Sequence, residues 1–244
     1  MNPVKVIVVG LLFSTQLCAS EHAHWGYSGH EGPAHWGDLS ADFSACSQGL
    51  NQSPIDLTGM IDGNLPELSF NYTSLGNQVV NNGHTIKVNY LPGSNIQIND
   101  SRFELKQFHF HSPSENLIKG ESFPMEAHFV HADKEGNLAV VAVMYRVGEA
   151  DQELEKAWAL MPEEAGREVG LETNINAAQL IPESKDYYRF NGSLTTPPCT
   201  EGVEWYVMKG IQTVSQQQLD RFVKIMKHDN NRPVQPLNAR IVVE

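Results

Sequence analysis

The stretch Gln107-Phe108-His109-Phe110-His111 decides the fold, because apolar and polar side chains alternate along it. A period of two is typical of a β-strand that is buried on one face. On such a strand His109 and His111 point to one side of a sheet, and Phe108 and Phe110 point to the other. The stretch therefore predicts a sheet with an apolar face and a face that carries paired imidazoles.

Segments of the same kind recur along the chain, and turn signals such as Asn82-Gly83 separate them. This frequency predicts a mainly β, mostly antiparallel sheet. The predicted strands are Glu67–Phe70, Gln78–Val80, Thr85–Tyr90, Asn95–Ile98, Arg102–His111, Met125–His131, Leu138–Val147, Tyr187–Phe190, Val203–Met208 and Ala239–Val242.

Helices are predicted over residues 151–160 and 215–226 only. The second helix opens with Ser215, a residue that favours the N-cap position. Both helices are expected to lie against the sheet. The apolar face of the second would consist of Leu219, Phe222, Val223 and Met226.

The composition indicates one globular domain. The 244 residues are 41% hydrophobic and 19% charged, and no repeat or linker divides residues 21–244. Seventeen basic residues stand against 29 acidic ones, which gives a net charge of -12. No run of Lys or Arg is present, so the composition argues against a nucleic-acid partner.

Residues 1–20 have the pattern of a secretory signal peptide, with an apolar run from Val6 to Phe13 and small residues before Glu21. The alternative, an anchoring helix, needs an apolar run of roughly 20 residues. We therefore expect cleavage near Ser20, a periplasmic or secreted protein, and no stable membrane anchor. Loss of Lys5 with the leader would change the net charge to 16 minus 29, or -13.

Two cysteines, Cys46 and Cys199, remain after removal of the leader. An even pair in an exported chain predicts a disulfide, with two buried free thiols as the alternative.

A third imidazole could join His109 and His111 from a neighbouring strand. The segment Met125–His131 offers His128 and His131 on opposite faces, and Glu126 shares the face of His128. We favour His128, because a ligating imidazole usually donates its other N–H to a carboxylate or a carbonyl. Three histidines form the ligand set of catalytic zinc and leave a fourth position open. On chemistry alone, paired strand histidines can also be structural or interfacial.

Five further motifs occur in order along the chain, and together they resemble the α-class carbonic anhydrases, specifically the bacterial exported branch. They are His24-Trp25-Gly26-Tyr27, Gly32-Pro33-Ala34-His35-Trp36, Gln52-Ser53-Pro54-Ile55, Asn81-Asn82-Gly83-His84 and Ser193-Leu194-Thr195-Thr196-Pro197-Pro198-Cys199. The resemblance runs from His24 to about Val242. It implies a single catalytic domain over residues 21–244, with a large central sheet, short peripheral helices and a conical cavity that reaches zinc.

The resemblance implies that Zn²⁺ is held by His109, His111 and His128. Gln107 and Glu126 would hold His109 and His128 from behind, and a carbonyl near Asn230 would hold His111. The implied reaction is the reversible hydration of carbon dioxide to bicarbonate and a proton, in which hydroxide on zinc attacks the carbon. Weak esterase activity is an expected side reaction.

The resemblance also assigns catalytic roles. Thr195 would donate its proton to Glu115 and so admit only an oxygen that bears hydrogen, whereas alone it would be a turn hydroxyl. His84 would shuttle the proton to buffer, helped by Tyr27 and Asn82, whereas alone it would be an exposed turn residue. The carbon dioxide pocket would consist of Val130, Val140, Leu194, Thr196 and Trp205.

Other features have simpler interpretations. The remaining histidines are expected in an aromatic N-terminal segment with Trp25, Tyr27 and Trp36, or in structural positions: His22, His24, His30 and His35 in the first group, His131 and His228 in the second. Cis peptide bonds are expected at Ser53-Pro54 and Pro197-Pro198. The chain departs from the animal pattern at Ser112-Pro113-Ser114, and at Lys87 on the cavity wall, where a neutral polar residue is usual.

Two other functions remain open at this stage. A non-catalytic binding module could keep the fold, and a zinc hydrolase of esters or peptides could use the same metal. Bacterial members of the family often form homodimers, and no stretch of this sequence locates an interface.

Overall fold

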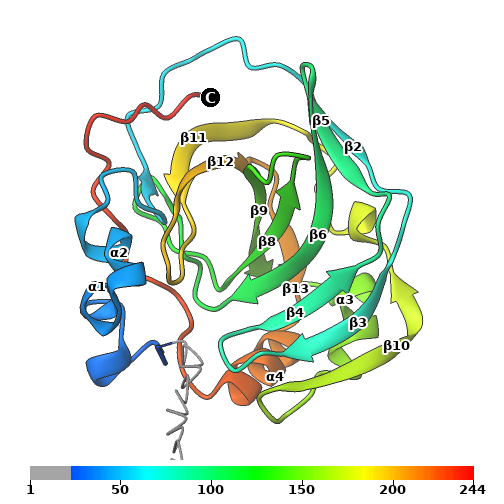
Figure 1. The fold of residues 1–244 in the computed structure, drawn as a ribbon. Helices are drawn as coiled ribbons and strands as arrows, with labels where there is room; N and C mark the ends of the chain where they lie inside the picture. Colours follow the sequence, from blue (N-terminus) through cyan, green and yellow to red (C-terminus); the bar gives the residue numbers. More distant parts are fainter. Residues whose placement is uncertain (1–22) are drawn as a thin grey trace, which may run out of the picture.

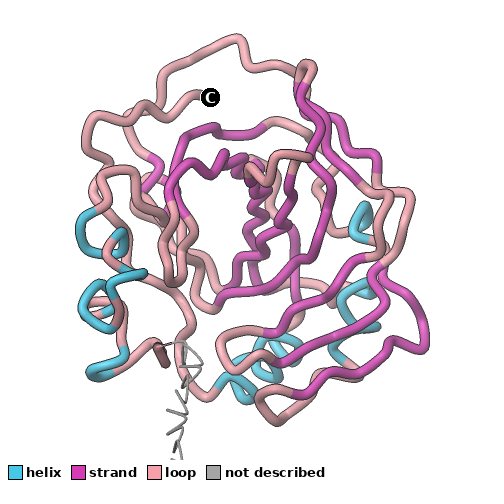
Figure 2. The backbone as a smooth tube through the Cα atoms, viewed as in Figure 1, coloured by secondary structure: helices cyan, strands magenta, loops and turns pink. Residues whose placement is uncertain are grey.

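The computed structural model describes residues 23–244 of the chain. The predicted leader and His22 lie outside the described residues. Figure 1 shows a curled sheet in the middle of the molecule, with the N-terminal helices on one side and α3 and α4 on another. Strands form the interior in Figure 2, and the helices are peripheral.

The large sheet contains eleven strands, with the main order β10-β3-β4-β6-β8-β9-β12-β11. Most pairs are antiparallel, but β12 and β13 both pair with β9 in parallel. A separate parallel pair joins β1 and β7. The bounds are β1 Asp56–Leu57, β2 Leu68–Asn71, β3 Gly76–Asn81, β4 Ile86–Tyr90, β5 Asn95–Ile98, β6 Ser101–His111, β7 Leu117–Ile118, β8 Met125–Ala132, β9 Leu138–Val147, β10 Arg167–Ile175, β11 Tyr187–Ser193, β12 Glu201–Met208 and β13 Gln212–Val214.

The two faces of β6 differ as the alternation predicts. Phe108 and Phe110 are fully buried in the larger core cluster, together with Trp158 of α3 and Phe222 of α4. The imidazoles of β6 therefore face away from this core. A second apolar cluster, built around Trp205, lies among β9, β11 and β12.

The helices are α1 Trp36–Leu39, α2 Ala45–Gln48, α3 Gln152–Trp158 and α4 Gln216–Met226, with 3-10 turns at Gly29–Glu31, Ala41–Phe43 and Ala177–Gln179. The N-cap prediction is confirmed, since Ser215 and Gln218 form a capping box at α4. The prediction that Val223 belongs to the apolar face of α4 that packs on the core is wrong. Val223 is 42% exposed, whereas Leu219, Phe222 and Met226 are buried.

The strand predicted over residues 239–242 is wrong. Val243 makes only isolated bridges, with Ile61 and Arg189. Four strands were missed: β1, β7, β10 and β13. The longest of these, β10, pairs only with β3, and most of its side chains are exposed. Its edge position removes the alternating burial that the pattern search needs.

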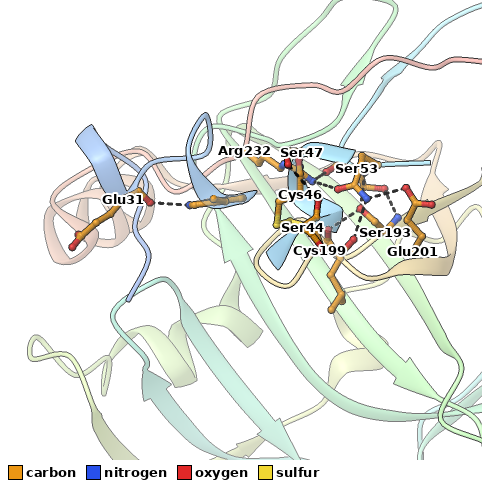
Figure 3. Close-up of a disulfide and its surroundings, with 12 residues drawn as sticks. Glu31, Ser44, Cys46, Ser47, Ser53, Ser193, Cys199, Glu201 and Arg232 are labelled. Carbon is orange, nitrogen blue, oxygen red and sulfur yellow. Dashed lines mark hydrogen bonds between the residues drawn. A yellow bond between two sulfur atoms is a disulfide. The ribbon is translucent and has the colours of Figure 1, made fainter. Parts of the chain in front are cut away.

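The predicted disulfide between Cys46 and Cys199 is confirmed, and it joins positions 153 residues apart. Figure 3 shows this bond between the segment that carries Ser44 and Ser53 and the segment that carries Ser193 and Glu201. The peptide bonds before Pro54 and Pro198 are cis, as expected, and the bond before Pro113 is also cis. Within residues 23–244, no helix combines the length and the apolar character needed to cross a bilayer.

Candidate metal centre and cavity

Three histidines from two neighbouring strands meet on the polar face of the sheet. His109 of β6 lies directly opposite His128 of β8 in the antiparallel register. His111 lies two residues further along β6, so it points to the same face. One ligand nitrogen from each of the three lies within 4.8 Å of the other two.

The other nitrogen of each imidazole has a hydrogen-bond acceptor. Nδ1 of His109 lies 2.9 Å from Oε1 of Gln107, and Nδ1 of His111 lies 2.6 Å from the carbonyl oxygen of Asn230. Nε2 of His128 lies 2.9 Å from Oε1 of Glu126. These acceptors require an N–H on the nitrogen that they face. The nitrogens left for a ligand are therefore Nε2 of His109 and His111, and Nδ1 of His128.

The surroundings of the three histidines favour the neutral imidazole, which is the form that binds a metal. Burial lowers the pKa of His109 and His128 well below the ordinary value of 6.5, and neighbouring histidines lower it further. Burial also lowers the pKa of His111. Nε2 of His111 is buried without a hydrogen-bond partner among the described residues. A metal ion at this point would satisfy it.

Glu126 is held rigidly behind His128. Its Oε2 accepts backbone N–H bonds from Glu115 at 2.7 Å and Asn116 at 2.9 Å. Its Oε1 also accepts from the Asn116 side chain at 2.7 Å. The carboxylate is fully buried, which raises its pKa, whereas the Asn116 donors oppose that rise. The orientation of His128 is thus fixed by a carboxylate that cannot rotate freely.

Glu115 lies beside the histidines. Its Oε1 accepts the backbone N–H of Arg232 at 2.8 Å, and its Oε2 lies 3.5 Å from Nε2 of His111. Burial raises the pKa of Glu115 well above its ordinary value, and the Arg232 backbone N–H and the nearby Thr195 hydroxyl oppose that rise. The structure therefore brings Thr195 and Glu115 together beside the candidate metal centre.

A cavity of about 240 Å³ opens in front of the histidines. The ring of His84 stacks on Trp25 with 3.7 Å between centroids. Burial lowers the pKa of His84, and charge on His24 and His228 lowers it further. The residues that line the cavity are Trp25, Tyr27, Asn82, His84, Thr85, Lys87, Gln107, His109, His111 and Thr196. A larger hollow of about 410 Å³ lies around residues 62–68 and 185–187, but no histidine lines it.

The four apolar residues expected around the substrate belong to one cluster. Val140 and Trp205 are buried in it, and Val130 and Leu194 pack against it while partly exposed. The ring of Trp205 lies 4.9 Å from that of His128. The cluster therefore adjoins the candidate metal centre, and Thr196 lines the cavity in front of it.

Tyr27 and His131 have different surroundings. The hydroxyl of Tyr27 is buried without a hydrogen-bond partner among the described residues. His131 is fully buried and makes structural contacts, with Nε2 2.8 Å from the Tyr72 hydroxyl and Nδ1 3.3 Å from the Ala139 carbonyl oxygen. The structure thus separates His131 from the three clustered histidines.

Sequence reasoning missed Asn116 and Arg232. Asn116 directly follows Glu115, but a lone Asn in a loop carries no signal of its own. Arg232 is 1% exposed, and its guanidinium donates to the carbonyl oxygens of Cys46 and Ser53, as Figure 3 shows, and to the side chain of Gln52. An Arg in a polar C-terminal stretch reads as a surface residue, so no sequence signal could have found this role.

Comparison with known proteins finds relatives of this chain. The family model described as eukaryotic-type carbonic anhydrase matches residues 31–244. A carbonic anhydrase of Neisseria gonorrhoeae is 49% identical over 98% of this chain and 96% of its own length. The structure is similar to that of an α-carbonic anhydrase from Thermovibrio ammonificans in complex with sulfanilamide, with a TM-score of 0.90 and 52% identity over 91% of this chain and 100% of that chain. An α-carbonic anhydrase of Photobacterium profundum gives a TM-score of 0.87 at 47% identity, over 91% of this chain and all of that chain.

Proposed function

The chain belongs to the eukaryotic-type, or α, carbonic anhydrase family, and from that premise we propose that it catalyses the reversible hydration of carbon dioxide at a zinc ion held by His109, His111 and His128. The observation that carries the proposal is the set of three clustered imidazoles, each with an acceptor at its second nitrogen. Zinc supplies Lewis acidity, which lowers the pKa of a bound water to about 7 and provides a nucleophile at neutral pH.

Thr195 and Glu115 orient the nucleophile. Glu115 Oε2 has no hydrogen-bond partner among the described residues, so it is available to accept a hydrogen bond from the Thr195 hydroxyl. The Thr195 oxygen is then an acceptor towards the cavity. It admits an incoming oxygen that carries a hydrogen and turns that oxygen's lone pair towards the substrate.

The apolar residues beside His128 bind carbon dioxide, which has no charge and is a weak hydrogen-bond acceptor. Val140 and Trp205 are 3% and 1% exposed, and this wall excludes water from the carbon that is attacked. Val130, Leu194 and Thr196 complete the proposed pocket.

His84 moves the proton out of the cavity. Its imidazole lies at the cavity wall with Tyr27 and Asn82, where water can link it to the metal centre. Nδ1 or Nε2 accepts the proton from that water and releases it to buffer, because an imidazole titrates near neutrality.

We also propose that residues 1–20 are a signal peptide, that residues 21–244 form the catalytic domain, and that the mature protein is periplasmic or secreted. The disulfide supports this location, because such bonds persist in oxidising compartments. The mass of the protein recovered from the periplasm tests the cleavage site near Ser20.

Stopped-flow measurement of carbon dioxide hydration tests the reaction. We expect fast hydration by the mature protein, its loss on removal of zinc with a chelator, and its return when zinc is added. His109→Ala is expected to lose hydration and zinc, whereas His30→Ala, at an exposed position, is the matched control and keeps both. A folded protein with one bound zinc and no hydration would instead support the non-catalytic binding module, and a preference for activated esters would support a zinc hydrolase.

A further inference from the structure

Lys87 lies in the wall of the cavity beside the metal centre. It is directly opposite His109 in the register of β4 and β6, and residues opposite one another in an antiparallel pair share a face. It lines the cavity with His109 and His111, and its side chain is half-buried. The ammonium group is therefore placed on the side of the sheet where the reaction occurs.

The Lys87 ammonium has no carboxylate partner. Lys106, Lys156 and Lys209 each form an ion pair with a glutamate, at 2.9, 2.7 and 3.0 Å. Among the described residues, no carboxylate oxygen lies within the 4.0 Å of an ion pair from Lys87. Its charge is thus free to act on a ligand in the cavity.

No carboxylate competes with Lys87 from the cavity wall. None of the ten lining residues is Asp or Glu, and Lys87 is the one Lys or Arg among them. Glu115 and Glu126 are 1% and 0% exposed and are not lining residues. The whole chain, in contrast, carries a net charge of -12, which repels anions at long range. A small anion that reaches the cavity therefore meets an unpaired cation in an otherwise acidic protein.

We propose that Lys87 is an anion-recognition residue, which strengthens the binding of bicarbonate and of other small monovalent anions in the cavity. This inference rests on the proposed function, since bicarbonate is the anionic species of that reaction. Carbon dioxide carries no net charge, so Lys87 acts on the bicarbonate side of the reaction. A unit charge several ångströms away in a hydrated cavity changes the affinity for an anion by about 3- to 10-fold, and the effect weakens as ionic strength rises.

Three variants test the role of Lys87: Lys87→Gln removes the charge, Lys87→Arg keeps it, and Lys106→Gln makes the same change in net charge outside the cavity. Each folded protein is loaded with cobalt(II) in place of zinc, and its visible absorption is followed during titration with bicarbonate and, separately, thiocyanate. At fixed pH and low ionic strength, we expect the dissociation constant to rise about 3- to 10-fold for Lys87→Gln. The dissociation constants of Lys87→Arg and Lys106→Gln should stay close to that of the unchanged chain.

Equal anion affinities for Lys87→Gln and the unchanged chain would overturn the inference. It would also be overturned if Lys106→Gln weakened anion binding to the same extent, because the cause would then be the change in net charge. Unchanged anion affinity together with a new dependence of hydration on buffer concentration would make Lys87 a proton carrier instead. Hydration by the unchanged chain on zinc is measured separately. Its absence would refute the proposed reaction, whereas the cobalt titrations would still report on Lys87.

Discussion

At the residue scale, the acceptor behind each imidazole decides which nitrogen is left for the metal. Glu126 is the most constrained of these acceptors, because it receives three N–H donors from Glu115 and Asn116 as well as facing His128. Replacement of Glu126 by Gln would give His128 a weaker, uncharged acceptor. It would also replace one carboxylate oxygen, which now accepts from Asn116, by an NH₂ group that donates. If the three histidines hold zinc as proposed, the affinity for the ion depends on a residue that does not bind it.

We predict that Glu126→Gln lowers zinc affinity by about 10- to 100-fold, the usual effect of losing such a partner. Competition for zinc against a chromophoric chelator measures it. Glu104→Gln on the neighbouring strand is the control, because Glu104 is partly exposed and pairs only with Lys106. Unchanged zinc affinity for Glu126→Gln would show that His128 does not need the carboxylate.

His84 gives a prediction about pH. Burial, with a smaller effect of charge on His24 and His228, lowers the pKa of His84 below its ordinary 6.5. Only the neutral imidazole accepts a proton, and it predominates above the pKa. At saturating carbon dioxide and low buffer, proton release through His84 limits kcat, so kcat should hold as pH falls to 6.5 and decline only below that value. The ratio kcat/KM should fall at higher pH, because it follows the proposed zinc-bound water, whose pKa is about 7.

Stopped-flow rates between pH 5 and 8 check this, with His84→Ala as the comparison. We expect His84→Ala to be slower by about tenfold or more at low buffer, and imidazole buffer to restore the rate. A decline of kcat centred above pH 6.5, or no rescue of His84→Ala by imidazole, would contradict the assignment.

At the element scale, α4 is fixed by its first turn. Ser215 Oγ accepts the backbone N–H of Gln218 at 3.2 Å, and the Gln218 side chain returns a contact to the Ser215 backbone. Gln218 also donates to the backbone of Asp151 and to Glu155, so it joins α4 to α3. We predict that Ser215→Ala lowers the free energy of unfolding by about 1 kcal/mol, measured by urea denaturation. Ser215→Asp should retain most of it, and equal loss in both variants would show that the cap is unimportant.

A second prediction at this scale concerns β8. His131 is held neutral between Tyr72, just after β2, and the carbonyl of Ala139 on β9. Burial lowers its pKa from 6.5 to about 3. Below pH 6.5 the unfolded chain therefore binds a proton at His131, whereas the folded chain does not bind it until about pH 3. The free energy of unfolding consequently decreases as the pH is lowered from 6.5 towards 3.

The loss approaches about 1.4 kcal/mol per pH unit. Denaturant unfolding of the unchanged chain and of His131→Gln between pH 4 and 7 measures it. The three clustered histidines are common to both proteins, so their titration cancels in the difference. A stability difference that does not vary with pH would contradict the prediction.

The same elements show which parts of the fold can be predicted from the sequence. The alternation in β6 predicts its two faces because one side packs against a continuous core, and the Ser215 cap is a local signal. Strand β10 was not predicted, because it pairs only with β3 at the edge of the sheet and most of its side chains, some of them charged, are exposed rather than alternately buried. The failed strand at residues 239–242 lies in a segment where only Val242 is buried and Ile241 is 58% exposed, and none of these four residues joins a ladder. Arg232 bonds Glu115, and Asn116 bonds Glu126, beside the candidate metal centre. The first of these loop contacts joins distant parts of the chain, and no spacing rule predicts either.

At the scale of the whole molecule, the disulfide joins two parts of the chain that the sheet does not hold to each other directly. Cys46 belongs to the short α2, and Cys199 follows the loop that carries Thr195 and Thr196. The backbone N–H of Cys199 donates to the carbonyl of Thr196 at 2.9 Å, and its carbonyl accepts from Gln52 at 3.0 Å. This region therefore couples the stability of the molecule to the position of the loop that carries Thr195.

We predict that Cys46→Ser/Cys199→Ser lowers the free energy of unfolding by about 2 to 5 kcal/mol, because the crosslink closes a long loop in the unfolded chain. Denaturant unfolding measures the change, and reduction of the unchanged chain should produce a loss of similar size. Zinc content should persist in the folded variant, since His109, His111 and His128 lie on β6 and β8, which are paired along their length. Loss of zinc from the folded variant would mean that the disulfide supports the metal centre itself and not only the loop beside it.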